Sequence, residues 1–247
     1  MPETESSRLP DTALARGRWP RYLGLLLAGV LLAAYARGGA AWILGFCALA
    51  PWLWSLGRET SWRGTLFNAW LMTLAFTLAV FLWFGQAIGA YTDMGTPAAL
   101  LALLLLAPLL QPQFLVCALL RRWSLRAHGP WLGALAGAAA WIGCEALFPK
   151  LLGDTLGHGL ASALYLRQAA DLIGAAGLSF VLILVNEALV LAWRLRRSGV
   201  RALAAPLLLA LILPLALASY GQLRIGALAA HAEQTLPEAA TLRIGMV

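Results

Sequence analysis

Seven long apolar stretches, divided by short connections, constrain the fold of this chain more than any other feature. Of its 247 residues, 61% are hydrophobic and 12% are charged, which is more apolar than a soluble domain of this size requires. A bilayer core about 30 Å thick needs roughly 20 apolar helical residues per span. We therefore predict an all-α membrane protein, a polytopic bundle of seven transmembrane helices. The predicted spans are Tyr22–Ala36, Ala40–Leu56, Thr65–Ile88, Pro97–Leu120, Pro130–Phe148, Leu172–Trp193 and Ala202–Gly221.

Basic residues alternate between successive connections, thirteen on one side of the predicted bundle against five on the other. The positive-inside bias produces this pattern, and it places the N-terminus in the cytoplasm and everything after the seventh span outside. The net charge of +7 therefore indicates contact with anionic lipid headgroups rather than with nucleic acid. The richer side holds Arg8, Arg16, Arg18, Arg21, Arg58, Arg63, Arg121, Arg122, Arg126, Arg194, Arg196, Arg197 and Arg201, and the poorer side holds Arg37, Lys150, Arg167, Arg224 and Arg243.

Three regions follow from these patterns: a cytoplasmic tail over 1–21, a transmembrane domain over 22–221, and an extracytoplasmic segment over 222–247. The last segment starts as a polar linker and ends in Thr241–Val247, which has the pattern of a β-strand. Residues 16–36 also fit a secretory signal with a small-residue cleavage site. Because six further spans follow and the charge alternation already includes it, a retained first helix is favoured, and cleavage stays open.

Polar residues inside the apolar stretches are the first candidates for function, since burying charge in lipid is costly. Trp141 and Glu145 are four residues apart and project from one helix face. Glu145 is either hydrogen-bonded within the bundle or part of a substrate cleft. Asn186 and Glu187 favour hydrogen bonds between helices, and Asp171 begins the sixth span on the outer side.

The connection 149–171 is the longest and by topology lies outside the cell, where long loops often carry function. It contains His158, but no other histidine has a metal-ligand spacing to it, so we predict neither a metal site nor a cofactor. The serines lack a Gly-x-Ser-x-Gly context and no phosphate-binding glycine loop occurs. The three cysteines lie in apolar stretches and are interpreted as inert thiols: Cys47, Cys117 and Cys144.

The order of these features resembles the membrane portion of bacterial apolipoprotein N-acyltransferases. Trp141 and Glu145 are similar to the family's Trp-x-x-x-Glu pair in its fifth helix, although Phe148 and Pro149-Lys150 depart from the residues that follow there. The ending Leu242–Val247 resembles the first strand of the family's nitrilase-like domain. Further similarities lie in the aromatic- and glycine-rich stretch Gly85–Pro97, and at Gln168, Asp171-Leu172, Gly174, Gly177-Leu178-Ser179-Phe180 and Val185-Asn186.

The resemblance implies a multi-pass protein of the bacterial inner membrane that moves a fatty acyl chain from a phospholipid to the α-amino group of a lipoprotein's diacylglyceryl cysteine. A cysteine thioester is the intermediate, and the family's Glu-Lys-Cys set lies in a nitrilase-like domain in cis, which we expect after Val247. The chain as given would then be inactive. It would provide anchoring and lipid access, with a cleft expected around Trp83, Tyr91, Trp141, Glu145, His158 and Gln168.

Two other functions remain open from the sequence. The chain could be a non-catalytic membrane module that binds lipid or a partner protein. It could also be a transporter or another polytopic enzyme, but a transporter should show inverted repeats or paired broken helices, and no such repeat is visible.

Overall fold

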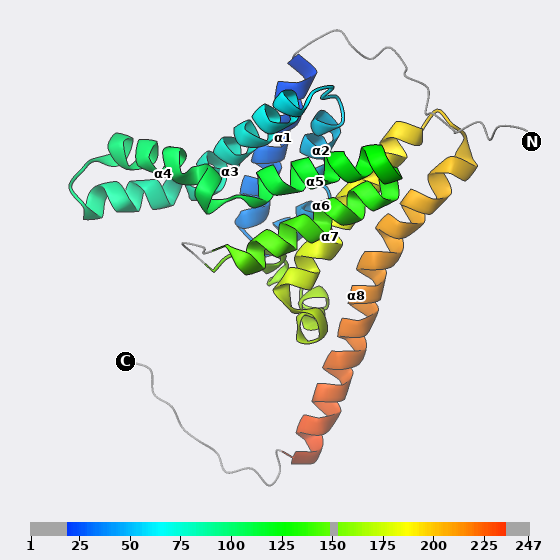
Figure 1. Cartoon of the computed structure of the whole chain (residues 1–247). Coiled ribbons are helices and arrows are strands. Elements are labelled where there is room, and N and C mark those ends of the chain that lie inside the picture. The colour runs from blue at the N-terminus through cyan, green and yellow to red at the C-terminus, as the bar shows by residue number, and fades with distance from the viewer. Residues whose placement is uncertain (1–18, 149–152, 236–247) are drawn as a thin grey trace, which may run out of the picture.

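The computed structural model describes residues 19–148 and 153–235, and this part of the chain is helical throughout, without a strand. It forms a helical bundle in which α1, α7 and α8 run steeply in the view of Figure 1. The α-helices are α1 Trp19–Ala36, α2 Ala50–Leu56, α3 Trp62–Tyr91, α4 Thr96–Leu110, α5 Gln113–His128, α6 Pro130–Leu147, α7 Ala170–Leu195 and α8 Val200–Thr235, and the 3-10 helices are η1 Gly39–Phe46, η2 Leu156–Leu160 and η3 Leu166–Ala169.

Six segments of the described residues are long and apolar enough to cross a membrane, one fewer than the sequence predicts. They are Trp19–Ala36, Gly39–Leu56, Trp62–Tyr91, Thr96–His128, Leu166–Leu195 and Val200–Ala232. The predicted span that is not among these six is the fifth, Pro130–Phe148, which is present as the 18-residue helix α6 Pro130–Leu147 and contains Glu145.

Two of the predicted spans are interrupted helices. Gln111 (φ −129°, ψ 55°) separates α4 from α5, because the proline that follows it disfavours helical backbone at the preceding residue. The predicted span Ala40–Leu56 is a 3-10 helix followed by the short helix α2, with residues 47–49 between them. A broken backbone at membrane depth must find hydrogen-bond partners inside the protein.

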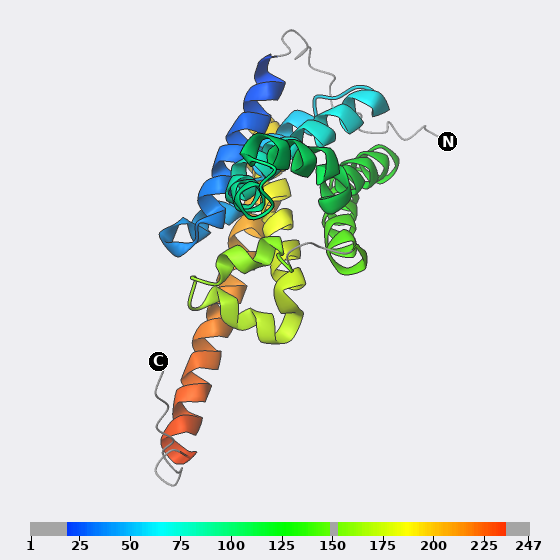
Figure 2. The same ribbon diagram turned by 90° about the vertical axis from the view of Figure 1, so that its left-hand side faces the viewer.

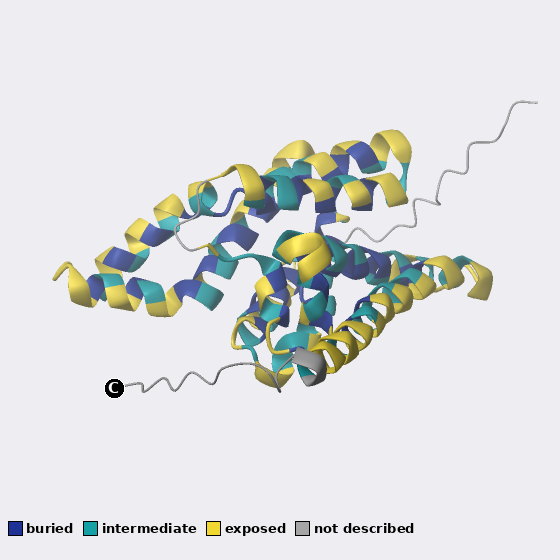
Figure 3. Ribbon diagram, turned by 90° about the horizontal axis from the view of Figure 1, so that it is seen from below, coloured by how far each residue is buried: buried dark blue, intermediate teal, exposed yellow. Residues whose placement is uncertain are grey.

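Helix α7 is the centre of the bundle, since it packs against α2, α6, α8, η1, η2 and η3. Buried side chains lie on helix faces that turn toward neighbouring helices, and exposed residues lie outside (Figure 3). The main core joins α1, α2, α3, α5, α6 and α7, and its centre holds the aromatic rings of Trp52, Phe114 and Trp141. Helix α4 packs on α3, and the two form a hairpin that projects from the bundle (Figure 1).

The arginine-rich connections meet at one end of the bundle. Arg21 of α1 pairs with Glu59 at 3.1 Å, and Arg122 of α5 donates to the Glu59 carbonyl at 2.6 Å. Arg122 and Arg126 both donate to the Thr60 carbonyl, at 2.5 and 2.9 Å. The first turn of α1 and the last turns of α5 are therefore both joined by charge-assisted hydrogen bonds to the segment between α2 and α3.

Helix α8 is the least buried span, with 11% of its most apolar window inside the protein. Its 36 residues extend about 54 Å, well beyond a bilayer core of about 30 Å. Its C-terminal part projects past the rest of the described structure (Figure 2). The helix lies close to the bundle at Gly221, where an added Cβ would be 1.8 Å from the Tyr165 carbonyl oxygen.

Gly221→Ala is expected to destabilise the protein by about 1–3 kcal/mol, because the contact is with backbone and α8 must shift to relieve it. Gly226→Ala is the matched control in the same helix, where nothing lies within 4 Å of the added Cβ, so it should stabilise by about 0.5–1 kcal/mol. Unfolding in mixed micelles, followed by circular dichroism, measures both. Equal effects of the two substitutions would contradict the close approach at Gly221.

Candidate functional site

The candidate site lies at the end of the bundle opposite the arginine-rich connections, where the segment 153–169 meets α6 and α7. Glu145 is on the last turns of α6, and its Oε1 accepts from Trp141 Nε1 at 2.9 Å. The same oxygen accepts from the Leu156 backbone N–H at 3.1 Å. The two residues that the sequence places on one helix face therefore hold the start of η2 against α6.

Three further hydrogen bonds join this segment to α1, α7 and η1. The Tyr35 hydroxyl of α1 donates to the Leu156 carbonyl at 2.7 Å, and the Gly157 N–H donates to Ser179 Oγ of α7 at 2.8 Å. Ser162 Oγ donates to the Gly39 carbonyl at 2.9 Å. The segment 153–169, the longest connection in the sequence, is thus a packed cap tied to α1, α6 and α7.

The cap has an apolar core of its own. Leu160, Leu166 and Leu182 are at most 5% exposed, and Tyr35 lies among them. Gly159 is required by this packing, because an added Cβ would be 2.2 Å from the Tyr35 ring. Burial of these side chains gives the cap a fixed position relative to the bundle.

The structure brings only part of the predicted cleft together. His158 follows Gly157 in η2 and is exposed, and its Nδ1 accepts from the Thr155 N–H at 3.2 Å. Gln168 donates to the Leu164 carbonyl at 3.1 Å within the cap. Trp83 and Tyr91 lie instead on the projecting α3–α4 hairpin and are 57% and 91% exposed. The predicted set is therefore divided between the cap and this hairpin.

Asp171 lies where the cap enters α7 and is bound by α8. Its carboxylate accepts from the Tyr220 hydroxyl at 2.7 Å and pairs with Arg224 Nε at 2.8 Å. Tyr220 and Arg224 are four residues apart on one face of α8. These contacts join α7 to α8 just beside Gly221, so the cap, α7 and α8 meet in one region.

Asn186 fills the break between η1 and α2. Its Oδ1 accepts from the Leu49 and Ala50 N–H groups, each at 2.8 Å, and its Nδ2 donates to the Gly45 and Leu182 carbonyls, each at 2.8 Å. The side chain is fully buried. All four hydrogen bonds that an asparagine amide can form are present, so this side chain closes the break between η1 and α2.

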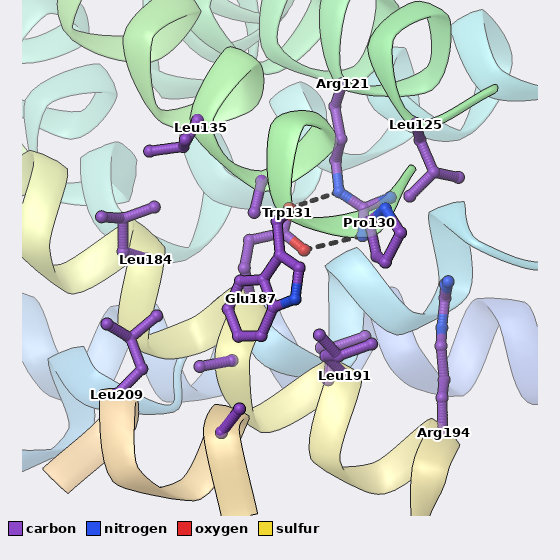
Figure 4. Close-up of a pocket in the computed structure, with 14 residues that line it drawn as sticks. Arg121, Leu125, Pro130, Trp131, Leu135, Leu184, Glu187, Leu191, Arg194 and Leu209 are labelled. Atoms are coloured by element: carbon purple, nitrogen blue, oxygen red, sulfur yellow. Dashed lines mark hydrogen bonds and ion pairs between the residues drawn. The ribbon is translucent and has the colours of Figure 1, made fainter. Parts of the chain in front are cut away.

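Glu187 is paired with Arg121 in the opposite half of the bundle (Figure 4). Arg121 Nε and Nη2 donate to the two carboxylate oxygens, the second at 2.7 Å. Both residues are nearly fully buried, at 4% and 5% exposure. A bidentate pair of this kind joins α5 to α7.

Sequence reasoning missed Tyr35, Ser179 and Tyr220 as contacts of the cap. Ser179 lacks a Gly-x-Ser-x-Gly context and lies in the stretch Gly177-Leu178-Ser179-Phe180 that resembles the family, and Tyr35 lies in the small-residue pattern Ala34-Tyr35-Ala36. The four-residue spacing of Tyr220 and Arg224 was the one local signal that could have indicated a shared partner. The hydrogen-bond partners of Tyr35 and Ser179 depend on how the cap packs against α1 and α7, and no local sequence pattern indicates that packing.

Within 19–148 and 153–235, no three His, Cys, Asp or Glu side chains are grouped as a metal site would need. Cys117 and Cys144 are buried in helices and Cys47 is half-buried. The strand predicted over Thr241–Val247, Lys150, and the tail 1–18 lie outside the described residues.

Comparison with known proteins identifies the family. The model of the apolipoprotein N-acyltransferase N-terminal domain matches residues 28–188, more than half of the chain and most of the bundle from α1 to α7. No curated protein and no solved structure matches. With its apolar helices and this match, the chain is a multi-pass membrane protein and belongs to the family of apolipoprotein N-acyltransferase N-terminal domains.

Proposed function

We propose that this chain is the membrane domain of an enzyme that transfers a fatty acyl chain from a phospholipid to the α-amino group of a lipoprotein's diacylglyceryl cysteine. The family match carries the proposal, because it covers α6, the cap and α7 up to Ala188. The domain would anchor the enzyme in the bacterial inner membrane and give its two lipid-anchored substrates access to the catalytic groups.

The proposed orientation places the arginine-rich end in the cytoplasm and the cap in the periplasm. The clustering of Arg21, Arg122 and Arg126 around the connection between α2 and α3 supports it, since these charges share one end of the bundle. The N-terminus would then be cytoplasmic and the C-terminal end of α8 periplasmic.

The proposed reaction has two steps. A cysteine thiolate in a nitrilase-like domain in cis attacks the ester carbonyl of the phospholipid, forms a thioester and releases a lysophospholipid. The free α-amino group of the lipoprotein then attacks the thioester, forms an amide and expels the thiolate. The cap would hold the reacting lipid groups beneath that domain and so raise their effective concentration.

Complementation of a bacterium depleted of its acyltransferase tests this function. The chain joined to a nitrilase-like domain after Val247 should restore growth, and the chain alone should not. Restoration by the chain alone would contradict the need for a second domain. Failure of the joined protein, when it is present in the membrane at normal level, would contradict the acyltransferase function.

In the joined protein, Glu145→Ala is expected to lower the rate of acyl-thioester formation at least tenfold, because the cap loses the acceptor that binds Leu156 and Trp141. Glu145→Gln keeps a carbonyl acceptor and should retain most of the rate. Asp93→Asn, at the exposed turn between α3 and α4, is the matched carboxylate-to-amide control and should have no effect. An unchanged rate in Glu145→Ala would remove Glu145 from the site.

A further inference from the structure

We propose that the groove between α5, α6, α7 and α8 at the arginine-rich end binds an anionic phospholipid, with its headgroup phosphate on Arg194 and an acyl chain along the leucines. This site is at the opposite end of the bundle from the cap, so the proposal does not depend on acyl transfer. It concerns a lipid that is bound and retained, and not one that reacts.

The groove has the volume that such a ligand needs, and its lining has an apolar part and a charged part. Its volume is about 340 Å³, within the range of ligand pockets, roughly 300–1,000 Å³, and far above the volume of one water molecule. Leu135, Leu184 and Leu209 line one part, and Arg194 lies at the other side of the close-up (Figure 4). Leu184 and Arg194 are ten residues apart on α7, so the lining extends about 15 Å along the helix.

The groove is open toward the surroundings of the bundle. Trp131 and Leu135, which form its α6 wall, are 41% and 43% exposed. Helix α8 closes the other side with Ala205 and Leu209. A lipid could therefore enter sideways from the bilayer, and the indole of Trp131 lies near the headgroup level that tryptophan prefers.

The charge of the groove is positive. Its charged lining residues are Arg121, Glu187 and Arg194, and because Glu187 forms its bidentate pair with Arg121, the lining carries one net positive charge. Arg194 makes no hydrogen bond or ion pair with any residue that the structure describes. A guanidinium without a hydrogen-bonded partner, at the end of an apolar groove, complements a phosphate attached to an acyl chain.

A bilayer lipid combines a phosphate group with apolar acyl chains, so it matches both the charged part and the apolar part of the groove. Basic pockets between transmembrane helices on the arginine-rich side bind the headgroups of anionic lipids. A free phosphate would leave the leucine-lined part empty, and an uncharged lipid would leave Arg194 without its counterion. A headgroup with a net negative charge is favoured over a zwitterionic one, whose ammonium would approach the Arg121 and Arg194 guanidinium groups.

The position of Arg194 depends on Gly57 at the end of α2. An added Cβ at Gly57 would be 1.4 Å from Arg194 Nη2, which is the flexible end of the side chain. Gly57→Ala must therefore displace the guanidinium while it keeps the charge in the protein. This substitution therefore tests whether lipid binding depends on the position of the Arg194 guanidinium and not only on the presence of its charge.

Native mass spectrometry of the full chain with phosphatidylglycerol and with phosphatidylethanolamine tests the site. Unsubstituted protein should retain phosphatidylglycerol in preference to phosphatidylethanolamine. Arg194→Gln should lower the affinity for phosphatidylglycerol about tenfold, the size of one charge-assisted hydrogen bond, and Gly57→Ala should also lower it. Circular dichroism would verify that each variant is folded.

Arg197→Gln is the matched control, since Arg197 lies in the connection after α7 and does not line the groove. It should leave phosphatidylglycerol retention unchanged. An equal loss in Arg197→Gln would show attraction to the general surface charge and would overturn the site. Unchanged affinity in a folded Arg194→Gln variant, or equal retention of the two lipids by the unsubstituted protein, would overturn it as well. Inorganic phosphate that competes as well as phosphatidylglycerol would overturn the assignment to a lipid.

Discussion

Arg121→Ala is expected to lower the free energy of unfolding by about 3–5 kcal/mol, because it leaves the Glu187 carboxylate buried without its partner. Both groups are at most 5% exposed and lie between α5 and α7, so loss of the guanidinium leaves the carboxylate at a buried position. Unfolding of the detergent-solubilised chain in mixed micelles, followed by circular dichroism, measures the change.

Two controls separate the ion pair from the loss of a side chain. The double variant Arg121→Met with Glu187→Leu removes both charges and should be much less destabilised than Arg121→Ala, because no unpaired charge remains. Arg126→Ala, which loses one exposed hydrogen bond to the Thr60 carbonyl on the same helix, should cost less than about 1 kcal/mol. A double variant as unstable as Arg121→Ala would show that packing, and not charge pairing, is the main contribution of these residues.

Asn186→Leu is expected to lower the free energy of unfolding by about 2–6 kcal/mol, because the Leu49 N–H and the Gly45 carbonyl each lose a buried hydrogen bond worth about 1–3 kcal/mol. These groups border the break between η1 and α2, and the Ala50 N–H also donates to the Cys47 carbonyl at 3.1 Å, so loss of Asn186 leaves it one partner. The same unfolding measurement applies.

Asn68→Leu is the matched control for Asn186→Leu, because it removes the same amide from another buried position. Asn68 Nδ2 donates to Ser55 Oγ at 2.9 Å and to Glu59 Oε1 at 3.4 Å, and both acceptors are side chains. Its loss should therefore cost only about 1 kcal/mol. If the two substitutions were equally destabilising, the backbone break at 47–49 would not depend on Asn186.

The two proposed lipid sites lie at opposite ends of the bundle and can be tested separately. Variants at Glu145 should change acyl-thioester formation and leave phosphatidylglycerol retention intact. Variants at Arg194 should do the reverse. Each result bears on one proposal alone, because Glu145 binds the cap and Arg194 lines the groove toward the other end of the bundle.

The sequence by itself determined the fold class, most helix positions and the family. The length of an apolar stretch identifies a span, and the alternation of arginines indicates which span ends lie on the same side of the membrane. Both signals can be read from short stretches of the sequence. The four-residue spacing of Trp141 and Glu145 likewise anticipates their hydrogen bond, because the geometry of a helix fixes it.

Only the tertiary structure decided which polar groups meet. Glu187 pairs with Arg121, which is 66 residues away in the sequence. Asn186 accepts from Leu49 and Ala50, which are 137 and 136 residues away, in a segment that hydropathy predicts as one continuous helix. The connection that the sequence describes only as long and polar is a packed cap, since Tyr35 and Ser179 bind it from two different helices. Hydropathy and periodicity report where each helix is, whereas hydrogen-bond partners depend on which helices pack together and on their rotation.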